Sequence, residues 1–330
     1  MSKPKVLVTR KIPEEAIQLL EQYCDVEINP HDREMTRKEL LESVRNKDGV
    51  LCLLTNTIDE EVFEAAGKQC KIFSNYAVGY NNIDVEGASR RGIAITNTPG
   101  VLDDATADLA WALLFAVARR IPEGDQYIRD GRFTAWSPTL LLGRDITGKT
   151  LGIIGAGRIG SNFGRKAKAF DMKILYTGTK PNHSFEAETG ATFTDKETLL
   201  KASDFISIHV PLSPATKYYI GDREFDMMKN TAILINTSRG PVINEKALVQ
   251  ALKEKKIWGA GLDVFENEPE LTPGLTQLDN VVIVPHIGSA TVESRLKMGI
   301  MAVQNIIQAL QGEIPDHCIN PAVYEHKLKK

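Results

Sequence analysis

Short apolar runs separated by amphipathic stretches make up the first hundred residues. Helical patterns, the first of them beginning at Pro13, stand between these runs. Apolar strands that alternate with amphipathic helices are typical of a parallel sheet covered by helices on both faces. The strand-like runs are KVLVT (5–9), DVEI (25–28), GVLCLL (49–54), KIF (71–73) and GIAIT (92–96).

The same alternation begins again at residue 150. A long helical stretch interrupts the rhythm, so the restart predicts a second α/β unit. A chain of 330 residues is also long enough for two domains, which usually have ~100 to 200 residues each. The fold class we expect is therefore α/β, with two doubly wound parallel-sheet domains. The later strand-like runs are TLGII (150–154), KILY (173–176), FISIHV (205–210), AILINT (232–237), GAGLDV (259–264) and NVVIVPH (280–286).

Two long helical stretches suggest where the domains meet. Residues 101–120 are apolar nearly all round, which predicts a buried helix, placed here between the domains. Residues 290–313 have the pattern of a long amphipathic helix that would carry the chain back to the first unit. We therefore expect a substrate domain from residues 1–98 and 289–330, and an inserted cofactor domain from residues 99–288.

Composition and charge indicate the class of partner. With 42% hydrophobic and 25% charged residues, the chain has the make-up of a globular protein. Its net charge of -3 disfavours a nucleic-acid platform, which needs a basic surface. No signal core of ~7 to 15 apolar residues stands at the start, and no apolar run approaches the ~20 residues that cross a bilayer. We expect a cytoplasmic protein that binds small molecules, and neither nucleic acid nor membrane.

The four cysteines give no sign of a metal or disulfide framework. They lie far apart and without C-x-x-C spacing, so buried, reduced thiols are the favoured interpretation. No cluster of metal-ligating residues stands out elsewhere. The cysteines are Cys24, Cys52, Cys70 and Cys318.

A glycine-rich turn indicates a dinucleotide site. Gly155-Ala-Gly157-Arg-Ile-Gly160 follows an apolar strand and opens a helical run, which makes an otherwise weak pattern specific. Gly155 allows the tight turn, Gly157 lets the backbone approach a pyrophosphate, and Gly160 lets helix and strand pack closely. The amino end of the helix then faces the anion.

The residues after the next strand bear on the choice of cofactor. NAD-binding proteins usually carry an acidic residue there, ~20 residues after the glycines, for the ribose hydroxyls. Here the chain reads Thr177-Gly178-Thr179-Lys180, without a carboxylate. Hydroxyls and a lysine can receive a 2'-phosphate that an aspartate would repel, although Lys180 can also be a solvated loop charge. We expect NADP(H) to be favoured, with NAD(H) still usable.

Three ionisable residues follow strands of the second unit. Arg239 comes after AILINTS, Glu268 after GLDVFEN, and His286 closes VVIVP. Each residue type by itself is more often structural or a surface charge. Placed together at the ends of neighbouring strands, where α/β enzymes have their sites, the three predict a catalytic group.

In several segments the chain resembles the D-isomer-specific 2-hydroxyacid dehydrogenases, with a Rossmann cofactor domain inserted into a flavodoxin-like substrate domain. Within that family it looks most similar to the glyoxylate or hydroxypyruvate reductases, partly through LYTG at 175–178. The resemblance extends over both units. The matching segments are NYAVGYNNID (75–84), GIIGAGRIG (152–160), HVPLSPATKYYI (209–220), INTSRGPVINEKAL (235–248), GAGLDVFENEPE (259–270) and VVIVPHIGSAT (281–291).

The resemblance implies a role for each member of the catalytic group. Arg239 would hold the substrate's carboxylate and carbonyl with its planar fork of donors. His286 would give a proton to the oxygen as the carbonyl is reduced, and take it back in the reverse direction. Glu268 would orient the imidazole and favour its charged form.

By the same resemblance, the first unit supplies the substrate's other contacts. Backbone N–H groups of the loop that holds Val78 and Gly79 would receive the carboxylate, unless this stretch is a plain turn. Leu54 would touch the substrate's side chain. Phosphoglycerate dehydrogenases carry an arginine for phosphate in that stretch, so Leu54 and Thr55 favour a small, uncharged substituent.

The same resemblance implies further cofactor contacts. Thr106, Thr237 and Asp263 would lie at the nicotinamide, with the Asp263 carboxylate on the carboxamide. Turn chemistry for the threonines and a strand-end cap for Asp263 are the alternatives. The adenosine and pyrophosphate side would be lined by Val210, Pro211 and Thr216, and Arg158, Ile159, Ser238 and Gly288 complete the set.

The function that follows is reduction of a small 2-keto acid, glyoxylate or hydroxypyruvate, to the D-2-hydroxy acid with NAD(P)H. Phosphite or formate oxidation is an alternative on the same scaffold, but formate enzymes pair the histidine with glutamine, whereas Glu268 stands here. A dinucleotide-sensing co-repressor is the alternative from another class, and the acidic balance of the chain disfavours it.

The resemblance also predicts a homodimer. The helix from Val101 and the arm that follows it, through Trp136, would form a two-fold interface. In the resembling reductases an aromatic residue of this arm reaches the neighbour's active site, and Trp136 is the candidate. The alternative is a tryptophan buried within its own subunit.

Overall fold

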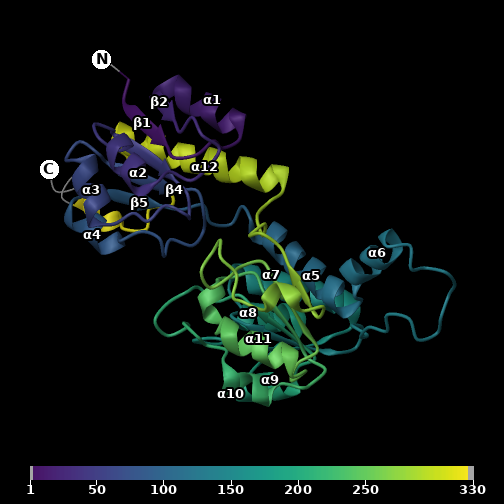
Figure 1. The fold of residues 1–330 in the computed structure, drawn as a ribbon. Helices are drawn as coiled ribbons and strands as arrows, with labels where there is room; N and C mark the ends of the chain where they lie inside the picture. Colours follow the sequence, from purple (N-terminus) through teal and green to yellow (C-terminus); the bar gives the residue numbers. More distant parts are fainter. Residues whose placement is uncertain (1–2, 326–330) are drawn as a thin grey trace. The chain divides into compact units, whose positions relative to one another are not determined.

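The computed structural model describes residues 3–325 and contains two compact units. The first takes in the chain up to Leu102 and from Ala290 onwards, and the second spans Asp103–Ser289. Both units have parallel strands joined by helices, and Figure 1 shows their elements. The predicted α/β class with two parallel sheets is confirmed.

The first unit is built on a five-stranded sheet in the order β2-β1-β3-β4-β5, with every pair parallel. This is the flavodoxin-like order, in which the chain turns outward from β1 in both directions. Its strands are β1 (Lys5–Val8), β2 (Asp25–Ile28), β3 (Gly49–Cys52), β4 (Ile72–Asn75) and β5 (Ala94–Thr96). Its helices are α1 (Glu14–Tyr23), α2 (Arg37–Ser43), α3 (Glu60–Ala66), α4 (Val85–Arg90) and α12 (Val292–Gln311), followed by the short η4 (Pro321–Tyr324).

The C-terminal helix α12 belongs to the first unit, as the pattern at 290–313 predicts. Figure 1 shows it, in yellow, beside the purple α1. Gly299 makes this approach close, since a Cβ atom there would lie 2.8 Å from the Cβ of Ala16. On the sheet side, the Ser74 hydroxyl donates to the Ala302 carbonyl at 2.9 Å. The chain therefore returns after more than 180 residues to complete the first core.

The second unit has a seven-stranded parallel sheet in the order β12-β11-β10-β9-β6-β7-β8. Counted from β6, this is the Rossmann order, with the reversal between β6 and β9. Its strands are β6 (Thr150–Ile154), β7 (Lys173–Thr177), β8 (Thr192–Phe193), β9 (Phe205–Ile208), β10 (Ile233–Asn236), β11 (Gly259–Leu262) and β12 (Val281–Ile283). Its helices are α5 (Asp103–Ala118), α6 (Ile121–Arg129), α7 (Arg158–Ala167), α8 (His183–Thr189), α9 (Lys196–Ala202), α10 (Asp222–Met227) and α11 (Glu245–Lys253), with η1 (Lys168–Phe170), η2 (Gly240–Val242) and η3 (Leu275–Gln277).

The long apolar helix α5 is part of the second core. It packs on α7 and on strands β10 and β11. Gly261 allows this contact, because a Cβ atom there would lie 2.9 Å from the Cβ of Leu113. The apolar character of α5 on most of its sides is explained by its contacts with the sheet on one side and with α7 on another.

Several strands end earlier than their apolar runs suggest, and one strand was not predicted. The runs at 205–210 and 280–286 leave the sheet at Ile208 and Ile283, so their last residues form loops at its carboxyl edge. The unpredicted strand, β8, has two residues and pairs only with β7. It is too short to produce an alternating pattern.

The next features concern membrane-spanning helices, metal ligands and the cysteines of the described residues. Among residues 3–325, none of the helices combines the length and the apolar character that crossing a bilayer requires. In the same range no three histidine, cysteine or acidic side chains gather as a set of metal ligands. The four cysteines are free thiols, three of them buried and Cys318 half-buried.

Candidate active site

Glu268 and His286 form a hydrogen-bonded pair at the carboxyl edge of the second sheet. His286 Nδ1 lies 2.8 Å from Glu268 Oε2, with side chains 26% and 31% exposed. The imidazole is therefore held at one nitrogen and reachable at the other. With Nδ1–H donating to the carboxylate, Nε2 is the nitrogen left for chemistry.

The backbone of His286 is held in an unusual conformation. Its φ of 52° lies in the left-handed region, which costs free energy for a residue with a side chain. Its N–H donates to the carbonyls of Asp263, at 2.9 Å, and Val284, at 3.1 Å. The loop after β12 is thus tied to the end of β11, and this fixes the direction of the imidazole.

Arg239 follows β10 in a turn that one asparagine organises. The Asn236 amide donates to the Arg239 carbonyl at 3.0 Å, and its oxygen accepts from the N–H and the hydroxyl of Ser238 at 3.0 and 2.9 Å. Arg239 Nη1 donates to the Ser238 carbonyl at 2.7 Å. Burial lowers the pKa of Arg239, and the charge of Glu268 opposes that shift. Guanidinium and carboxylate therefore act on each other within one site.

The charge of Glu268 depends on its partners. Burial by itself would raise the pKa of this carboxyl group, but the hydrogen bond and the charge of His286 hold it below its ordinary value. The Phe265 N–H at 3.0 Å, donating to Oε1, and the charge of Arg239 act in the same direction. Glu268 is therefore an ionised acceptor at neutral pH, suited to stabilise a protonated imidazole.

Asp263 ends β11 and has its carboxylate turned to the backbone of the next loop. It accepts from Ile287 N–H at 2.6 Å and from Gly288 N–H at 2.8 Å. The side chain is buried, which raises its pKa to about 6 against the opposing effect of these donors and of His286. These are the contacts of a strand-end cap, the alternative that the sequence left open for this residue.

The glycine-rich turn has the geometry that a dinucleotide needs. Gly155 has a φ of 96°, and a side chain at Gly160 would collide with the Gly155 carbonyl. No atom lies within 4 Å of a Cβ position at Gly157, which is the N-cap of α7. The turn therefore leaves an open approach to backbone N–H groups at the amino end of a helix, as phosphate binding requires.

Other predicted cofactor residues differ in what they already bind. The Thr237 hydroxyl is buried and has no partner, so it has hydrogen-bonding capacity to offer a ligand. Thr106 is buried beside Gly288. The Thr216 hydroxyl donates to the Pro211 carbonyl at 2.6 Å, which is local turn chemistry. Val210 lies against the glycine turn, 2.7 Å from a Cβ position at Gly155, whereas Arg158 lies 3.5 Å from Asp103.

The end of β7 is open. Thr177 is buried, whereas Gly178, Thr179 and Lys180 are exposed. A Cβ atom at Gly178 would have only the Lys180 carbonyl near it, at 3.8 Å. The structure therefore has room for a side chain at this point.

In the first unit, amide side chains tie the two loops that hold Leu54, Val78 and Gly79. The Asn82 amide donates to the carbonyls of Leu53 and Asn56 at 3.2 and 3.0 Å. The Asn75 amide donates to the Gly79 carbonyl at 2.9 Å. Both loops follow parallel strands, β3 and β4, at the same edge of the sheet. Asn75 and Asn82 stand in the segment NYAVGYNNID (75–84), but the sequence alone predicted no role for their side chains.

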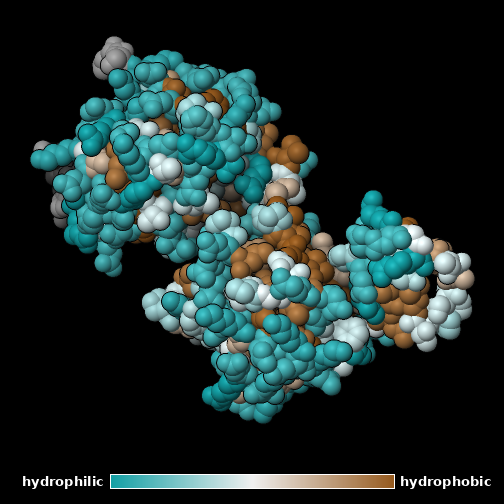
Figure 2. Space-filling view, in the orientation of Figure 1, coloured by the Kyte–Doolittle hydropathy of each residue, from teal (hydrophilic) through white to brown (hydrophobic). Residues whose placement is uncertain are grey.

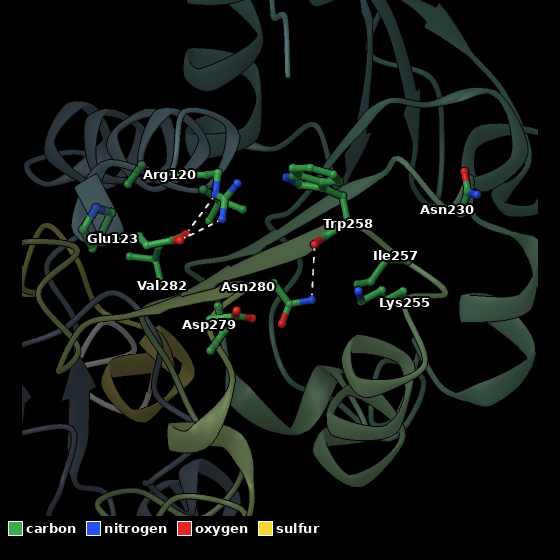
Figure 3. A pocket seen from close by; sticks show the side chains of 13 residues that line it. Arg120, Glu123, Asn230, Lys255, Ile257, Trp258, Asp279, Asn280 and Val282 are labelled. Carbon is green, nitrogen blue, oxygen red and sulfur yellow. Dashed lines mark hydrogen bonds and ion pairs between the residues drawn. The ribbon is translucent and has the colours of Figure 1, made fainter. Parts of the chain in front are cut away.

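One cavity of the second unit lies at the opposite edge of its sheet (Figure 3). It has a volume of about 300 Å³, and the Arg120–Glu123 ion pair, 2.7 Å between Nη2 and Oε1, forms part of its wall. Asn230, Trp258 and Asn280 also line it and stand within three residues before the starts of β10, β11 and β12. The catalytic candidates follow the carboxyl ends of those strands, so this cavity is not part of the candidate active site.

The sequence pattern of the NAD binding domain of D-isomer specific 2-hydroxyacid dehydrogenases matches residues 111–288. The chain belongs to this family. A glyoxylate reductase of Thermococcus litoralis is 51% identical over 97% of this chain and 98% of its own length. The glyoxylate reductase of Pyrococcus furiosus is 49% identical over 99% of this chain and 98% of its own length.

Solved structures of the same family have the same fold. A protein of Thermus thermophilus is 43% identical, with a TM-score of 0.89 over 96% of this chain and 99% of that one. An NADPH-dependent glyoxylate/hydroxypyruvate reductase of Sinorhizobium meliloti, solved with NADP and malonate, is 30% identical. Its TM-score is 0.86, over 97% of this chain and 98% of that one. As a member of the 2-hydroxyacid dehydrogenase family, the chain uses a nicotinamide dinucleotide and acts on a small hydroxy or keto acid.

Proposed function

We propose that the protein reduces glyoxylate and similar small 2-keto acids, such as hydroxypyruvate, to the D-2-hydroxy acid with NAD(P)H. The observation that carries this proposal is the Glu268–His286 pair beside Arg239 at the sheet edge. The relatives named above support the choice of substrate, since most of them are reductases of these acids.

The charge of each group suits its part in the reaction. Arg239 binds the carboxylate and the carbonyl oxygen of the keto acid, and so orients the carbon that is reduced. His286 gives a proton from Nε2 to that oxygen, and Glu268 stabilises the imidazolium from the other side. When bound, the dinucleotide supplies the hydride. The open glycine turn and the unpartnered Thr237 hydroxyl fit such a group.

The further cofactor contacts belong to the same proposal. Gly155, Gly157 and Gly160 shape the pyrophosphate site, with Arg158 and Ile159 at the start of α7. Toward the nicotinamide we assign Thr106, Thr237, Ser238, Asp263 and Gly288. The role of Asp263 changes, because its carboxylate holds the backbone of residues 287 and 288 and so shapes the nicotinamide end indirectly.

The first unit, on this proposal, is the substrate domain, and the second is the cofactor domain. Leu54, Val78 and Gly79 contact the keto acid there. Because no cationic side chain stands at Leu54 or Thr55, a small, uncharged substituent is favoured there. The amide contacts support this assignment, since Asn82 joins the two loops and Asn75 fixes the second of them at Gly79.

NADPH is the cofactor that we propose the protein prefers. No carboxylate stands at the end of β7, where Gly178 is open and Lys180 is exposed. Thr177, Thr179, Lys180 and Arg158 are the donors available near a 2'-phosphate. A contact between an exposed lysine and phosphate contributes ~1.5 to 3 kcal/mol at best, so NADH remains usable.

We also propose that two copies form a homodimer. The helix predicted for the interface from Val101, α5, has most of its residues buried in the second core, so we place the interface on α6, which has none, and on the arm that follows it, residues 130–145. Trp136 is 81% exposed, which excludes the alternative of a tryptophan buried within its own chain. Figure 2 shows apolar surface where α6 and the arm lie in Figure 1. The large apolar side chains there that are more than half exposed are Ile121, Ile128, Phe133, Trp136 and Leu142. Sedimentation of the purified protein at micromolar concentration should give a dimer, and a monomer would contradict this part.

Turnover with a panel of 2-keto acids tests the proposal. Glyoxylate, hydroxypyruvate, pyruvate and a 3-phosphorylated keto acid are offered with NADPH and with NADH. We expect the first two to be reduced fastest, the phosphorylated acid slowest, and NADPH to give the higher kcat/KM. Binding of the dinucleotide without turnover of any acid would instead indicate a sensor.

A further inference from the structure

Glu245 is a buried carboxyl group for which the proposed reaction has no role. It is the first residue of α11, and 2% of it is exposed. Its helix is already capped, because the Asn244 side chain accepts from Ala247 N–H at 3.2 Å. The Glu245 carboxyl group is turned instead to a loop more than 20 residues further along the chain.

The contacts of Glu245 are with the loop that leaves β11. Its Oε1 accepts from Glu266 N–H at 2.5 Å, and its Oε2 accepts from the Thr272 hydroxyl at 2.7 Å. In return, the Glu245 N–H donates to Glu266 Oε2 at 3.2 Å. The Tyr218 hydroxyl donates to Glu266 Oε1 at 2.5 Å. Two carboxyl groups thus join three segments of the second unit.

This loop carries Glu268. Glu268 lies two residues after Glu266, and its Oε1 accepts from Phe265 N–H at 3.0 Å. The segment that follows Arg239 packs closely against the same loop, since a side chain at Gly240 would collide with the Phe265 carbonyl. Glu245 therefore connects the segment that follows Arg239 to the loop that holds Glu268.

The position of Glu245 carries a cost in free energy. Burial, helped by the nearby charge of Glu266, raises the pKa of Glu245 above its ordinary value. The Thr272 hydroxyl and the Glu266 N–H oppose that shift. A buried carboxyl group destabilises a fold unless its oxygens are matched by donors. Here both oxygens have donors, and these donors, from Glu266 and Thr272, belong to the loop.

We infer that Glu245 is a positioning residue that ties the segment after Arg239 to the loop of Glu268, and so holds the Glu268 carboxylate at His286. The inference rests on the proposed function, in which Glu268 stabilises the protonated imidazole. Loss of the tie lets the loop move, and the carboxylate then stabilises that charge less well.

Two substitutions separate geometry from charge. Glu245→Ala removes both acceptors, and we expect kcat for glyoxylate reduction to fall about tenfold to a hundredfold. The alkaline limb of its pH profile should also move to lower pH, because the imidazolium has lost part of its stabilisation. Glu245→Gln keeps one acceptor and gains a donor for the Thr272 hydroxyl. It should retain most of the activity and keep the profile of the wild type.

Glu224→Ala is the matched control. Glu224 is also a largely buried carboxylate in the first turn of a helix of this unit, and it accepts from Gly221 N–H at 3.0 Å and from Lys196 at 2.9 Å. It touches neither the loop of Glu268 nor the catalytic candidates. We expect this variant to lower the melting temperature without moving the pH profile. The charged groups around His286 in this unit, namely Glu268, Asp263 and Arg239, stay the same in all variants.

The outcomes are distinguishable. If the wild-type protein reduces none of the keto acids, the proposed function fails. If the wild type is active and Glu245→Ala has a lower melting temperature but an unmoved pH profile, the positioning role is overturned and Glu245 is merely structural. Should Glu245→Ala not fold, Thr272→Val removes one donor alone. It should then shift the profile in the same direction by less, and an unmoved profile would again overturn the inference.

Discussion

The two units hold the loops at the carboxyl ends of their sheets in different ways. In the first unit, neutral amides do so, and Asn82 joins the loop after β3 to the loop after β4. In the second unit an amide, Asn236, holds the turn of Arg239, but charged groups hold the other catalytic loops, with Glu268 on His286 and Asp263 on the backbone of the next loop. Both sheets are parallel, with five and seven strands in different orders, and their loops differ in the groups that hold them.

Amide contacts and carboxylate–imidazole contacts differ in how they respond to pH. An amide keeps its hydrogen bonds over the whole range of pH in which proteins fold. It can therefore fix a shape for a substrate without adding a charge. A paired carboxylate and imidazole can exchange and stabilise protons. On this account the first unit shapes the substrate, and the second unit carries the chemistry.

The largest effect is expected where the charged pair is broken. His286→Ala removes the proton donor, and we expect kcat to fall by ~10² to 10⁴. Binding of NADPH, followed by its fluorescence, should stay nearly as in the wild type, because the imidazole does not hold the dinucleotide. Reduction within a few-fold of the wild-type rate would remove His286 from the reaction.

A charge placed at the end of β7 should change the choice of cofactor. In Gly178→Asp a new carboxylate fits without a clash, because the site is open. It would repel a 2'-phosphate and accept from the ribose hydroxyls. We expect the ratio of kcat/KM for NADPH to that for NADH to fall at least about tenfold. Gly178→Asn is the uncharged control and should move the ratio less; an equal shift would show that charge does not decide.

A smaller effect is expected where an amide is removed from the first unit. Asn82→Ala loses two hydrogen bonds between the loops, so KM for glyoxylate should rise about tenfold, with a smaller change in kcat. Affinity for NADPH should not change. The control is Asn320→Ala, which removes a more deeply buried amide that binds the backbone of Ile93 and Ile95 at β5. Equal changes of KM in both variants would argue for general loosening of the unit.

How much of this follows from the sequence depends on whether a contact is local. Both sheets, and the return of α12 to the first unit, follow from runs of apolar residues and from the amphipathic C-terminal stretch. Arg239, Glu268 and His286 are found because each stands at the end of such a run. The structure brings Glu268 and His286 to 2.8 Å, which no spacing along the chain could give.

Other features depend on contacts between distant segments. Glu245 looks like an ordinary acidic residue in the first turn of a helix, since its partners come more than 20 positions later. The packing of α5 on β10 and β11 was not predicted, because an apolar helix fits a domain boundary as well as a sheet. Asn82 stands in a motif, but the carbonyls that it binds lie 26 and 29 positions earlier.

The smallest effect concerns the stability of the second unit at acidic pH. His209, at the end of β9, lies 2.8 Å from Ser207 and is 5.2 Å from the ring of Phe163. Burial lowers its pKa from 6.5 to about 3. A histidine that stays neutral when folded takes up a proton on unfolding. Its contribution is therefore complete above pH 6.5 and is lost as the pH falls toward about 3.

His209→Gln should reduce that loss. Between about pH 6.5 and pH 5 the wild type should lose ~1 to 2 kcal/mol more than the variant. Thermal melts of both proteins across this range give the difference, and the slope matters rather than the absolute melting temperature. Parallel curves would show that His209 does not contribute to the acid sensitivity of the second unit.

Transfer of deuterium tests the central claim most directly. The protein is given hydroxypyruvate and NADPH labelled with deuterium at the hydride position, and the product is examined by NMR and by chiral chromatography. We predict D-glycerate with one deuterium at C2 in the wild type, and a rate lower by ~10² to 10⁴ in His286→Ala with NADPH still bound. An L-product, or a product without label at C2, would contradict the account.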